Sequence, residues 1–171
     1  NAIRIFSEKE VDELIILDID ATNEKRDPNY DLIAEMAGEA FMPVAYGGGI
    51  HNISQIRRLI RSGIEKVVIN TAATQSTDLI TEAASIYGSQ AIVVSIDIKK
   101  SFFGGYKVVS NSGTKETKLE LDEYIQLLVK SGAGEIFLNS VDRDGVMEGY
   151  DLRLLDAACN SCPLPVIIAA K

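Results

Sequence analysis

The regular alternation of short apolar runs with longer amphipathic runs constrains the fold of this chain more than any other feature of its sequence. The apolar runs carry β-branched residues on successive positions, which is typical of strands covered on both faces of a parallel sheet. Strands are expected at residues 13–18, 43–47, 66–70, 91–97, 135–140 and 164–169. Helices are expected between them, at about 29–40, 52–62, 76–87, 119–131 and 151–160. This order predicts an α/β fold built on a parallel sheet.

An internal repeat narrows the α/β fold to one architecture. "ELIILDID" from Glu13 aligns with "EIFLNSVD" from Glu135, and "MPVAYGGG" from Met42 aligns with "LPVIIAAK" from Leu164. A doubled array of strands and helices closes most naturally as a (β/α)8 TIM barrel. The chain is expected to begin inside a helix and to cover about six βα units of such a barrel. Residues 1–171 are therefore predicted to form a single barrel domain that lacks strand 1 and strand 8.

One connection is longer than the others. After Asp97 comes "KKSFFGGYKVVSNSGTKET", which contains a glycine pair and an alternating "YKVVS". This pattern predicts a β-hairpin inserted at the carboxyl end of the fourth strand, where it could serve as a lid.

Composition limits the kind of partner. The 171 residues are 46% hydrophobic and carry a formal net charge of −8, with no cluster of Lys and Arg. The charge argues against binding to nucleic acid or to an anionic membrane surface. No apolar run approaches the ~20 residues of a membrane helix, and the first residues lack a signal-peptide layout, so a cytoplasmic protein is expected. Cys159 and Cys162 are expected to be reduced cysteines at a helix end rather than a redox or zinc motif.

Carboxylates follow several of the expected strands. They are Asp18, Asp20, Asp97, Asp142 and Asp144. The carboxyl ends of barrel strands carry function, and a carboxylate held there against an apolar core can have its pKa adjusted for acid or base catalysis. Aspartate is also a common residue for leaving a strand and capping the next turn, the role favoured for Asp20 and Asp142. Catalysis is favoured for Asp97, because it ends an entirely apolar strand without a capping pattern after it.

Two neighbouring strands end in sequences suited to an anion. "GGGIHN" leads into Asn52 and Gln55, which have the spacing of a capping box, and "INTAATQS" places Asn70 and Thr71 after the next strand. Glycine turns and helix starts supply the backbone N–H groups that bind phosphate. The two sequences together predict one phosphate site.

Charged residues begin three alternate strands, at Glu13, Lys66 and Glu135. Alternate strands contribute to the same layer of a barrel, so these side chains could meet at its floor as a plug or gate. Solvated charges at strand starts are an equal alternative on spacing alone.

Other catalytic signatures are missing from the sequence. His51 is the only histidine, so neither a histidine-rich metal site nor a Ser-His-Asp triad is expected, and His51 is assigned to a surface helix start. "YGGGI" also fails to match the dinucleotide fingerprint.

The motif series "LDIDAT", "VAYGGGI", "VVINTAA", "VVSIDIK" and "NSVDRDGVMEGYD" resembles the cyclase subunits of imidazole glycerol phosphate synthase, from histidine biosynthesis. The resemblance runs through nearly the whole chain. It implies that ammonia from a partner glutaminase reacts with a bis-phosphorylated ribonucleotide, phosphoribulosyl-formimino aminoimidazole carboxamide ribonucleotide. The implied products are imidazole glycerol phosphate and aminoimidazole carboxamide ribonucleotide, and the implied reaction uses no metal or organic cofactor.

The resemblance also assigns residues. Asp97 matches the second catalytic aspartate of the family, and the first lies on the strand that this chain is expected to lack, so the 171 residues alone are expected to be inactive. Matches to the remaining positions are Asp18 and Asp144 at the mouth of the active site, Gly49, Asn70 and Thr71 at one phosphate, Gly145 at the second phosphate, and Glu13, Lys66 and Glu135 in the ammonia gate.

The sequence departs from the family at three places. Asn139 stands where a threonine is usual, "VME" fills the segment after "DRDG", and "AAK" replaces the glycines of the second phosphate site. Two alternatives therefore remain: a cyclase-like protein of surface-polysaccharide synthesis that uses ammonia to amidate a sugar, or a non-catalytic barrel fragment.

Overall fold

The computed structural model describes residues 2–101, 105–110, 113, 115–143 and 149–169. These residues form two compact units, Asn1–Ile69 and Asn70–Lys171.

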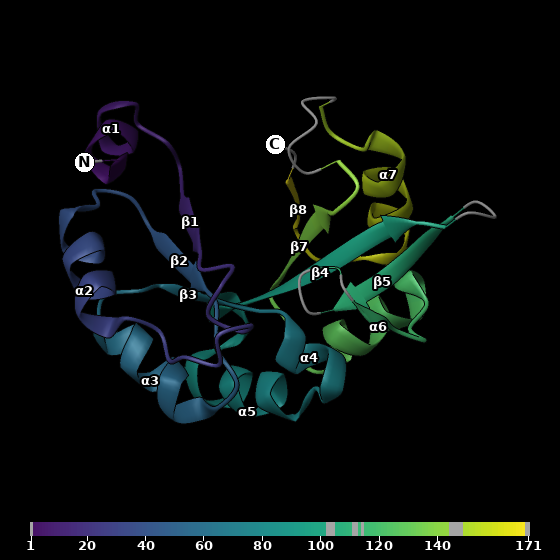
Figure 1. The fold of residues 1–171 in the computed structure, drawn as a ribbon, viewed down its shortest axis with the longest axis horizontal. Helices are drawn as coiled ribbons and strands as arrows, with labels where there is room; N and C mark the ends of the chain where they lie inside the picture. Colours follow the sequence, from purple (N-terminus) through teal and green to yellow (C-terminus); the bar gives the residue numbers. More distant parts are fainter. Residues whose placement is uncertain (1, 102–104, 111–112, 114, 144–148, 170–171) are drawn as a thin grey trace. The chain divides into compact units, whose positions relative to one another are not determined.

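The first unit is a parallel three-stranded arrangement with helices in the connections (Figure 1). In chain order its elements are α1 (Ala2–Glu8), β1 (Leu14–Leu17), α2 (Tyr30–Glu39), β2 (Val44–Gly47), α3 (Ile53–Arg61) and β3 (Lys66–Ile69). β2 lies between β1 and β3 and runs parallel to both, with Ile15 opposite Ala45 and Ala45 opposite Lys66. Parallel neighbours require a crossover, which α2 and α3 provide.

Side-chain caps set the starts of both crossover helices. Asn29 accepts a hydrogen bond from the Leu32 amide at the start of α2. α3 has the predicted capping box, in which Asn52 accepts from the Gln55 amide and Gln55 accepts from the Asn52 amide. Each bond satisfies an amide that the first helical turn leaves without a backbone partner.

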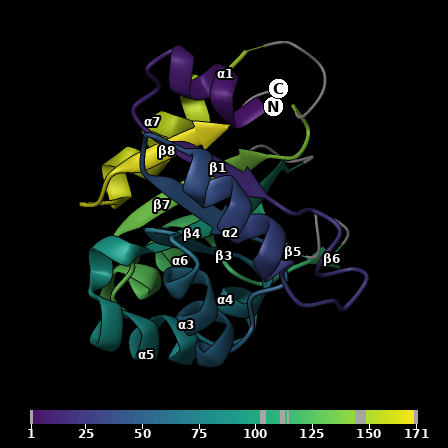
Figure 2. The same ribbon diagram turned by 90° about the vertical axis from the view of Figure 1, so that its left-hand side faces the viewer.

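The second unit contains the remaining elements (Figures 1 and 2). They are α4 (Thr71–Gln75), α5 (Asp78–Tyr87), the 3-10 turn η1 (Ser89–Ala91), β4 (Ile92–Lys100), β5 (Tyr106–Ser110), β6 (Lys115–Glu116), α6 (Leu121–Lys130), β7 (Glu135–Ser140), α7 (Leu152–Ser161) and β8 (Val166–Ala169). β7 lies between β4 and β8 and is parallel to both. α6 packs against α7 and β5, and α7 packs against β8.

The predicted hairpin after the fourth strand is present. β5 is antiparallel to β4, with Lys100 opposite Tyr106 and Asp97 opposite Val109, and β6 continues the antiparallel pairing. The tip of this hairpin lies outside the described residues. β4 therefore has a parallel neighbour on one edge and an antiparallel one on the other.

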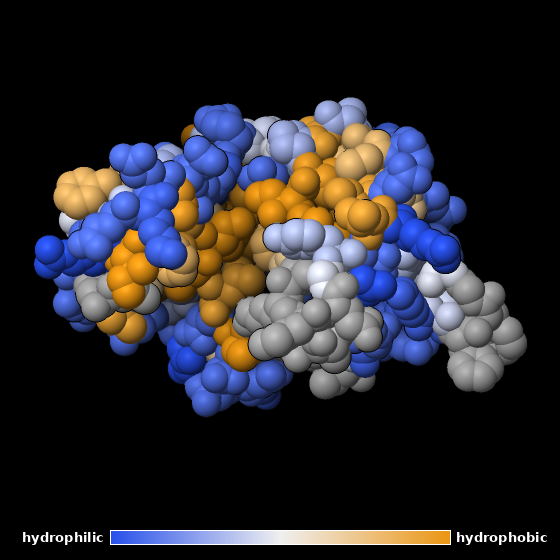
Figure 3. Space-filling view, turned by 90° about the horizontal axis from the view of Figure 1, so that it is seen from above, coloured by the Kyte–Doolittle hydropathy of each residue, from blue (hydrophilic) through white to orange (hydrophobic). Residues whose placement is uncertain are grey.

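β4 forms the centre of the core of the second unit. Every residue from Ile92 to Ile98 is buried, as predicted for a strand covered on both faces. Ile125 and Leu128 of α6 and Ile136 of β7 are fully buried as well. The space-filling view shows hydrophilic residues beside a broad area of hydrophobic ones (Figure 3).

The structure differs from the predicted elements in several respects, and β4 runs to Lys100 rather than ending at residue 97. The last strand begins at Val166 rather than at residue 164, because Pro165 has no amide hydrogen to donate to a sheet ladder. The short helix α4 was not expected, because its five residues are too few to show helical periodicity. No helix in the described ranges is long and apolar enough to cross a membrane.

Two adjacent leucines of α6 give a matched test of this packing. Leu128 is fully buried, whereas Leu127 is 45% exposed on the same helix. We expect Leu128→Ala to lower the free energy of unfolding by about 2–5 kcal/mol, because the lost side chain leaves a cavity. Leu127→Ala should cost less than about 1 kcal/mol. Urea unfolding measures both, and equal losses would contradict the packing of α6 described above.

Candidate functional site

The most unusual polar residue of the second unit is the buried carboxylate of Asp97. Asp97 lies near the end of β4 and is only 4% exposed. Asn139, its neighbour in the register on β7, donates from Nδ2 to Asp97 Oδ1 at 3.0 Å. The carboxylate is thus held at the edge of an apolar core by an amide donor rather than by a cation.

A second asparagine completes the surroundings of Asp97. Asn70, which precedes α4, donates from Nδ2 to Ser95 Oγ at 3.3 Å and lies close enough to the Asp97 carboxylate to affect its pKa. Burial raises the pKa of Asp97, while the hydrogen bonds from Asn139 and Asn70 act in the opposite direction. A carboxyl with a raised pKa is suited to exchange protons near neutral pH.

The side-chain oxygen of Asn70, unlike its side-chain nitrogen, lacks a hydrogen bond to any described residue. Asn70 Oδ1 is buried and has no hydrogen-bond partner among the described residues. An unsatisfied acceptor of this kind is uncommon in folded proteins and often marks a functional region. The sequence-predicted residues Asp97 and Asn70 are therefore brought together, and Asn139 and Ser95 join them.

Asp18 lies in the first unit and organises a loop. Its carboxylate receives two hydrogen bonds from the Arg26 guanidinium, Nη1 to Oδ2 at 2.6 Å and Nη2 to Oδ1 at 2.8 Å. Oδ1 also accepts from the amides of Asp20 and Ala21. The bonds from Arg26 are the main cause of the lowered pKa of Asp18. Asp18 therefore has the turn-capping role that the sequence assigned to Asp20.

The glycine turn after β2 is shaped by this same loop. Gly48 and Gly49 have φ angles of 132° and 66°, in the region that favours glycine. A Cβ on Gly48 would lie 2.5 Å from the Asp18 carbonyl oxygen, and one on Gly49 would lie 2.7 Å from the Arg26 carbonyl oxygen. These glycines allow the turn to lie against the β1–α2 loop, whether or not an anion binds there.

The predicted phosphate residues fall in different units. Gly49 lies in the first unit, and its amide has no partner among the described residues. Asn70 and Thr71 lie in the second unit, at the cap and first residue of α4. The shared phosphate site therefore stays a prediction.

Gln55 ties the capping box to the β1–α2 loop. Its side-chain oxygen accepts from the amides of His51 and Asn52, and its side-chain nitrogen donates to Asp27 at 2.7 Å. His51 is exposed at the start of the helix, as expected, and its Nδ1 lies 2.9 Å from the Gly49 carbonyl oxygen. Gln55 itself is buried, at 3% exposure, whereas its partners Asp27 and His51 are exposed, so this side chain links the core of the unit to its surface.

Two of the three predicted gate residues form an ion pair. Lys66 Nζ lies 2.8 Å from Glu13 Oε2, and both side chains are about one quarter exposed, at 26% and 24%. The second carboxylate oxygen, Oε1, is buried without a hydrogen-bond partner in the described ranges. Glu135 begins β7 in the other unit.

A buried cluster around Asp151 fastens the hairpin to the β7–α7 connection. Asp151, 3% exposed, caps α7 through the Leu154 amide and accepts from Tyr106 Oη at 3.0 Å. Lys100 Nζ and Arg143 Nε lie 3.4 and 3.7 Å from its other oxygen. The Leu154 amide, Tyr106 and Lys100 together lower the pKa of Asp151 despite its burial.

Asp142 contributes a further link between the same segments. Its Oδ2 accepts from the Lys100 amide at 2.7 Å, so it caps the end of β4 rather than its own turn. Asp144 and Gly145, predicted to contact substrate, lie outside the described residues. Sequence reasoning missed Asp151, Tyr106 and Arg26, because each acts through a partner at a distance that periodicity does not reveal.

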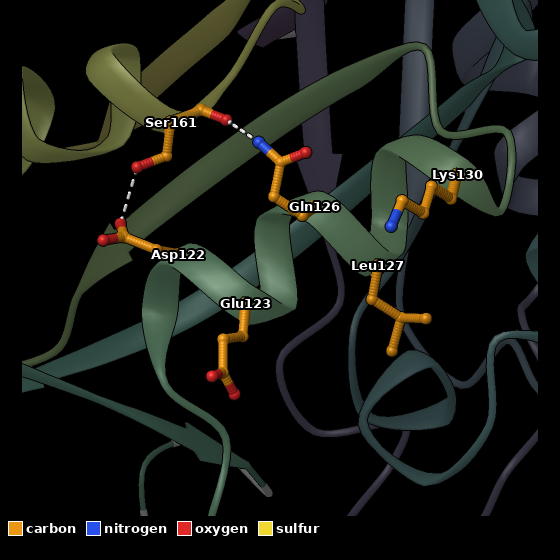
Figure 4. A pocket seen from close by; sticks show the side chains of 6 residues that line it. All are labelled: Asp122, Glu123, Gln126, Leu127, Lys130 and Ser161. Carbon is orange, nitrogen blue, oxygen red and sulfur yellow. Dashed lines mark hydrogen bonds between the residues drawn. The ribbon is translucent and has the colours of Figure 1, made fainter.

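A pocket of the second unit lies along α6 and the end of α7, and Asp97 is not among the residues that line it (Figure 4). It is lined by Asp122, Glu123, Gln126, Leu127, Lys130 and Ser161. Ser161 Oγ donates to Asp122 at 2.7 Å, and Gln126 donates to the Ser161 carbonyl oxygen. These bonds fasten the last turn of α7 to α6.

The side chains able to bind metals are dispersed. Within the described ranges, no three or more His, Cys, Asp or Glu side chains form a group that could hold a metal ion. Cys159 and Cys162 are free thiols in the last turn of α7 and at its cap.

Comparisons with known proteins relate the chain to one family. A family model described as "Histidine biosynthesis protein" matches residues 1–170. A Pseudomonas aeruginosa protein, provisionally named imidazole glycerol phosphate synthase subunit hisF2, is 52% identical over 98% of this chain. The imidazole glycerol phosphate synthase subunit HisF of Dictyoglomus thermophilum is 42% identical over 96% of it. The chain spans 66% and 65% of these two relatives, respectively.

The family match and the parallel strands with intervening helices confirm the predicted fold class, part of a (β/α)8 barrel. The described parallel strands β1, β2, β3, β4, β7 and β8 correspond to the expected ones.

The glycine turn yields a matched test. We expect Gly48→Ala to lower the free energy of unfolding by about 2 kcal/mol or more, because the new Cβ meets the Asp18 backbone and the φ angle disfavours an L side chain. Gly38→Ala is the control, because its Cβ meets nothing within 4 Å and the position is helical. Urea unfolding should show that Gly38→Ala is neutral or slightly stabilising; a neutral Gly48→Ala would contradict the close contact.

Replacing Asp97 or Asp151 by asparagine should change the free energy of unfolding at pH 7 in opposite directions. The pKa of folded Asp97 is raised, so its contribution to stability is lost as the pH rises through that pKa. Asp97→Asn should therefore raise the free energy of unfolding at pH 7, and the gain should vanish below the ordinary aspartate pKa of about 3.9. The pKa of Asp151 is lowered, so Asp151→Asn should lower stability at pH 7, with a loss that shrinks in acid. Unfolding from pH 3 to 8 measures both, and changes of the same sign would refute the assignment.

Proposed function

We propose that this chain, which belongs to the histidine biosynthesis protein family, is part of the cyclase subunit of imidazole glycerol phosphate synthase. In this function the subunit takes ammonia from a partner glutaminase and acts on phosphoribulosyl-formimino aminoimidazole carboxamide ribonucleotide. It forms imidazole glycerol phosphate and aminoimidazole carboxamide ribonucleotide in the cytoplasm. Residues 1–171 are proposed to belong to one barrel domain.

The buried Asp97 carboxylate is the observation that carries this proposal. Burial raises its pKa, and the amides of Asn139 and Asn70 hold it in a fixed orientation. A general acid or base needs these two properties, a pKa moved toward the working pH and a fixed position. Asp97 is proposed to move protons between substrate atoms during ring closure and bond cleavage.

Other residues are proposed to bind and deliver the reactants. Gly49, Asn70 and Thr71 are assigned to one substrate phosphate, and Gly145 to the second. Asp18 and Asp144 are assigned to the mouth of the site, where the ion pair of Asp18 with Arg26 supports a positioning role.

The ammonia gate is assigned to Glu13, Lys66 and Glu135. The ion pair between Glu13 and Lys66 supports this assignment, and the unpartnered Oε1 of Glu13 leaves one acceptor of that pair unsatisfied within its unit. No metal or organic cofactor is assigned to the reaction, and nucleic acid and membranes are not proposed as partners.

A second candidate is a cyclase-like protein that uses ammonia to amidate a sugar in surface-polysaccharide synthesis. The observation that favours it is Asn139, which contacts Asp97 at a position where the family usually has threonine. The numbered name of the P. aeruginosa relative, hisF2, also fits a second copy with its own substrate. A third candidate, a non-catalytic barrel fragment, would show no turnover in any context.

Turnover with ammonium separates these candidates. The full-length protein that carries this chain is incubated with the ribonucleotide and an ammonium salt, and imidazole glycerol phosphate is measured. Asp97→Asn should lower kcat at least about 100-fold, because the proton-transferring group is lost. The 171 residues alone should show no turnover.

Circular dichroism serves as the folding control for Asp97→Asn. An unchanged kcat in this variant would remove Asp97 from its proposed role. A folded full-length protein that ignores the ribonucleotide but amidates a sugar would establish the second candidate instead.

A further inference from the structure

The orientation of the Asn139 amide is determined by Asp97. Its nitrogen faces the carboxylate at 3.0 Å, so its oxygen faces away from Asp97 Oδ1. The opposite orientation would bring the amide oxygen against a carboxylate oxygen, two acceptors without a hydrogen between them. Asn139 Oδ1 is therefore an acceptor beside Asp97 that the carboxylate does not use.

The two asparagines around Asp97 differ in what their oxygens can reach. Asn70 Oδ1 is buried, whereas Asn139 is half-buried and its oxygen is not among the buried unpartnered atoms of the described residues. Within the core, Asn70 and its hydrogen-bond partner Ser95 lie near the Asp97 carboxylate. The Asn139 oxygen is thus an acceptor beside Asp97 for which the described residues show no hydrogen bond.

We propose that Asn139 is a specificity-determining residue that presents, together with Asp97, two neighbouring acceptor oxygens to ammonia or ammonium. This proposal rests on the proposed function, in which ammonia is a reactant. A nitrogen with several hydrogens can donate to both oxygens at once, and a negative carboxylate favours its protonated form. A threonine hydroxyl would have to serve Asp97 and the ligand with a single oxygen, whereas the asparagine amide divides these contacts between two atoms.

Binding can be tested without turnover. The full-length protein labelled with 15N is titrated with ammonium chloride, and with tetramethylammonium chloride, a cation that has no N–H group. We expect a saturable shift of the residue 139 backbone amide with ammonium and none with tetramethylammonium. Asn139→Leu should abolish the shift and Asn139→Thr should weaken it.

Ser140→Ala is the matched control for this titration. Ser140 is the next residue of β7, is 4% exposed, and its side chain lies on the other face of the strand. This variant should keep the shift. Equal shifts with both cations, or an unchanged titration in Asn139→Leu, would overturn the proposal.

Kinetics with ammonium as the nitrogen source give the second measurement. Asn139→Leu should raise the KM for ammonium about tenfold, the effect of one lost hydrogen bond, with a smaller change in kcat. Ser140→Ala should leave both constants unchanged. An unchanged KM in an active Asn139→Leu enzyme would overturn the proposal. If the wild-type protein binds ammonium but does not convert the ribonucleotide, the proposed function fails and the Asn139 site stands.

Discussion

Burial of the Asp97 carboxylate within the covered part of β4 is the constraint on which the core of the second unit depends. β4 is covered from Ile92 to Ile98, and Asp97 is the only ionisable group in that stretch. Burying a charged carboxylate in an apolar strand costs free energy unless hydrogen-bond donors contact it. The neighbouring positions accordingly carry amides, with Asn139 on β7 and Asn70 before α4.

In the first unit, a different set of contacts holds the polar β1–α2 loop against the end of the strands. The paired hydrogen bonds between Arg26 and Asp18 close the β1–α2 loop, and the glycines after β2 remove the side chains that would collide with it. Gln55 joins Asp27 to the start of α3, so loop, turn and helix form one hydrogen-bonded assembly. A bidentate guanidinium–carboxylate pair fixes direction as well as distance, which suits this purpose.

Much of the fold could be predicted because the strands, caps and hairpin depend on residues close together in the sequence. Strands such as β4 are continuous apolar runs, and the α3 capping box follows from the spacing of Asn52 and Gln55. The alternation in "YKVVS" predicts the hairpin. The helix α4 could not be predicted, because its five residues are too few to show a helical period.

The side-chain contacts of the candidate site were harder to predict from the sequence. Asp97 could be singled out by its place after an apolar run, but its contact with Asn139 depends on the register of strands 42 residues apart. The turn-capping role of Asp18 was hidden because Asp18 and Asp20 both follow the same strand, and the position of Arg26 is not apparent from the sequence. Composition and periodicity carry no information on such long-range pairing.

The Asp151 cluster has a consequence for how the second unit can move. One carboxylate holds the first turn of α7, the Tyr106 hydroxyl of the hairpin and two cations, so none of these segments can shift alone without leaving a buried charge partly unpaired. The hairpin and the start of α7 are thereby coupled into one cooperative element beside the strand end that carries Asp97. A displacement of either segment would break contacts of the same Asp151 carboxylate, although Tyr106 and Asp151 are separated by 45 residues of chain.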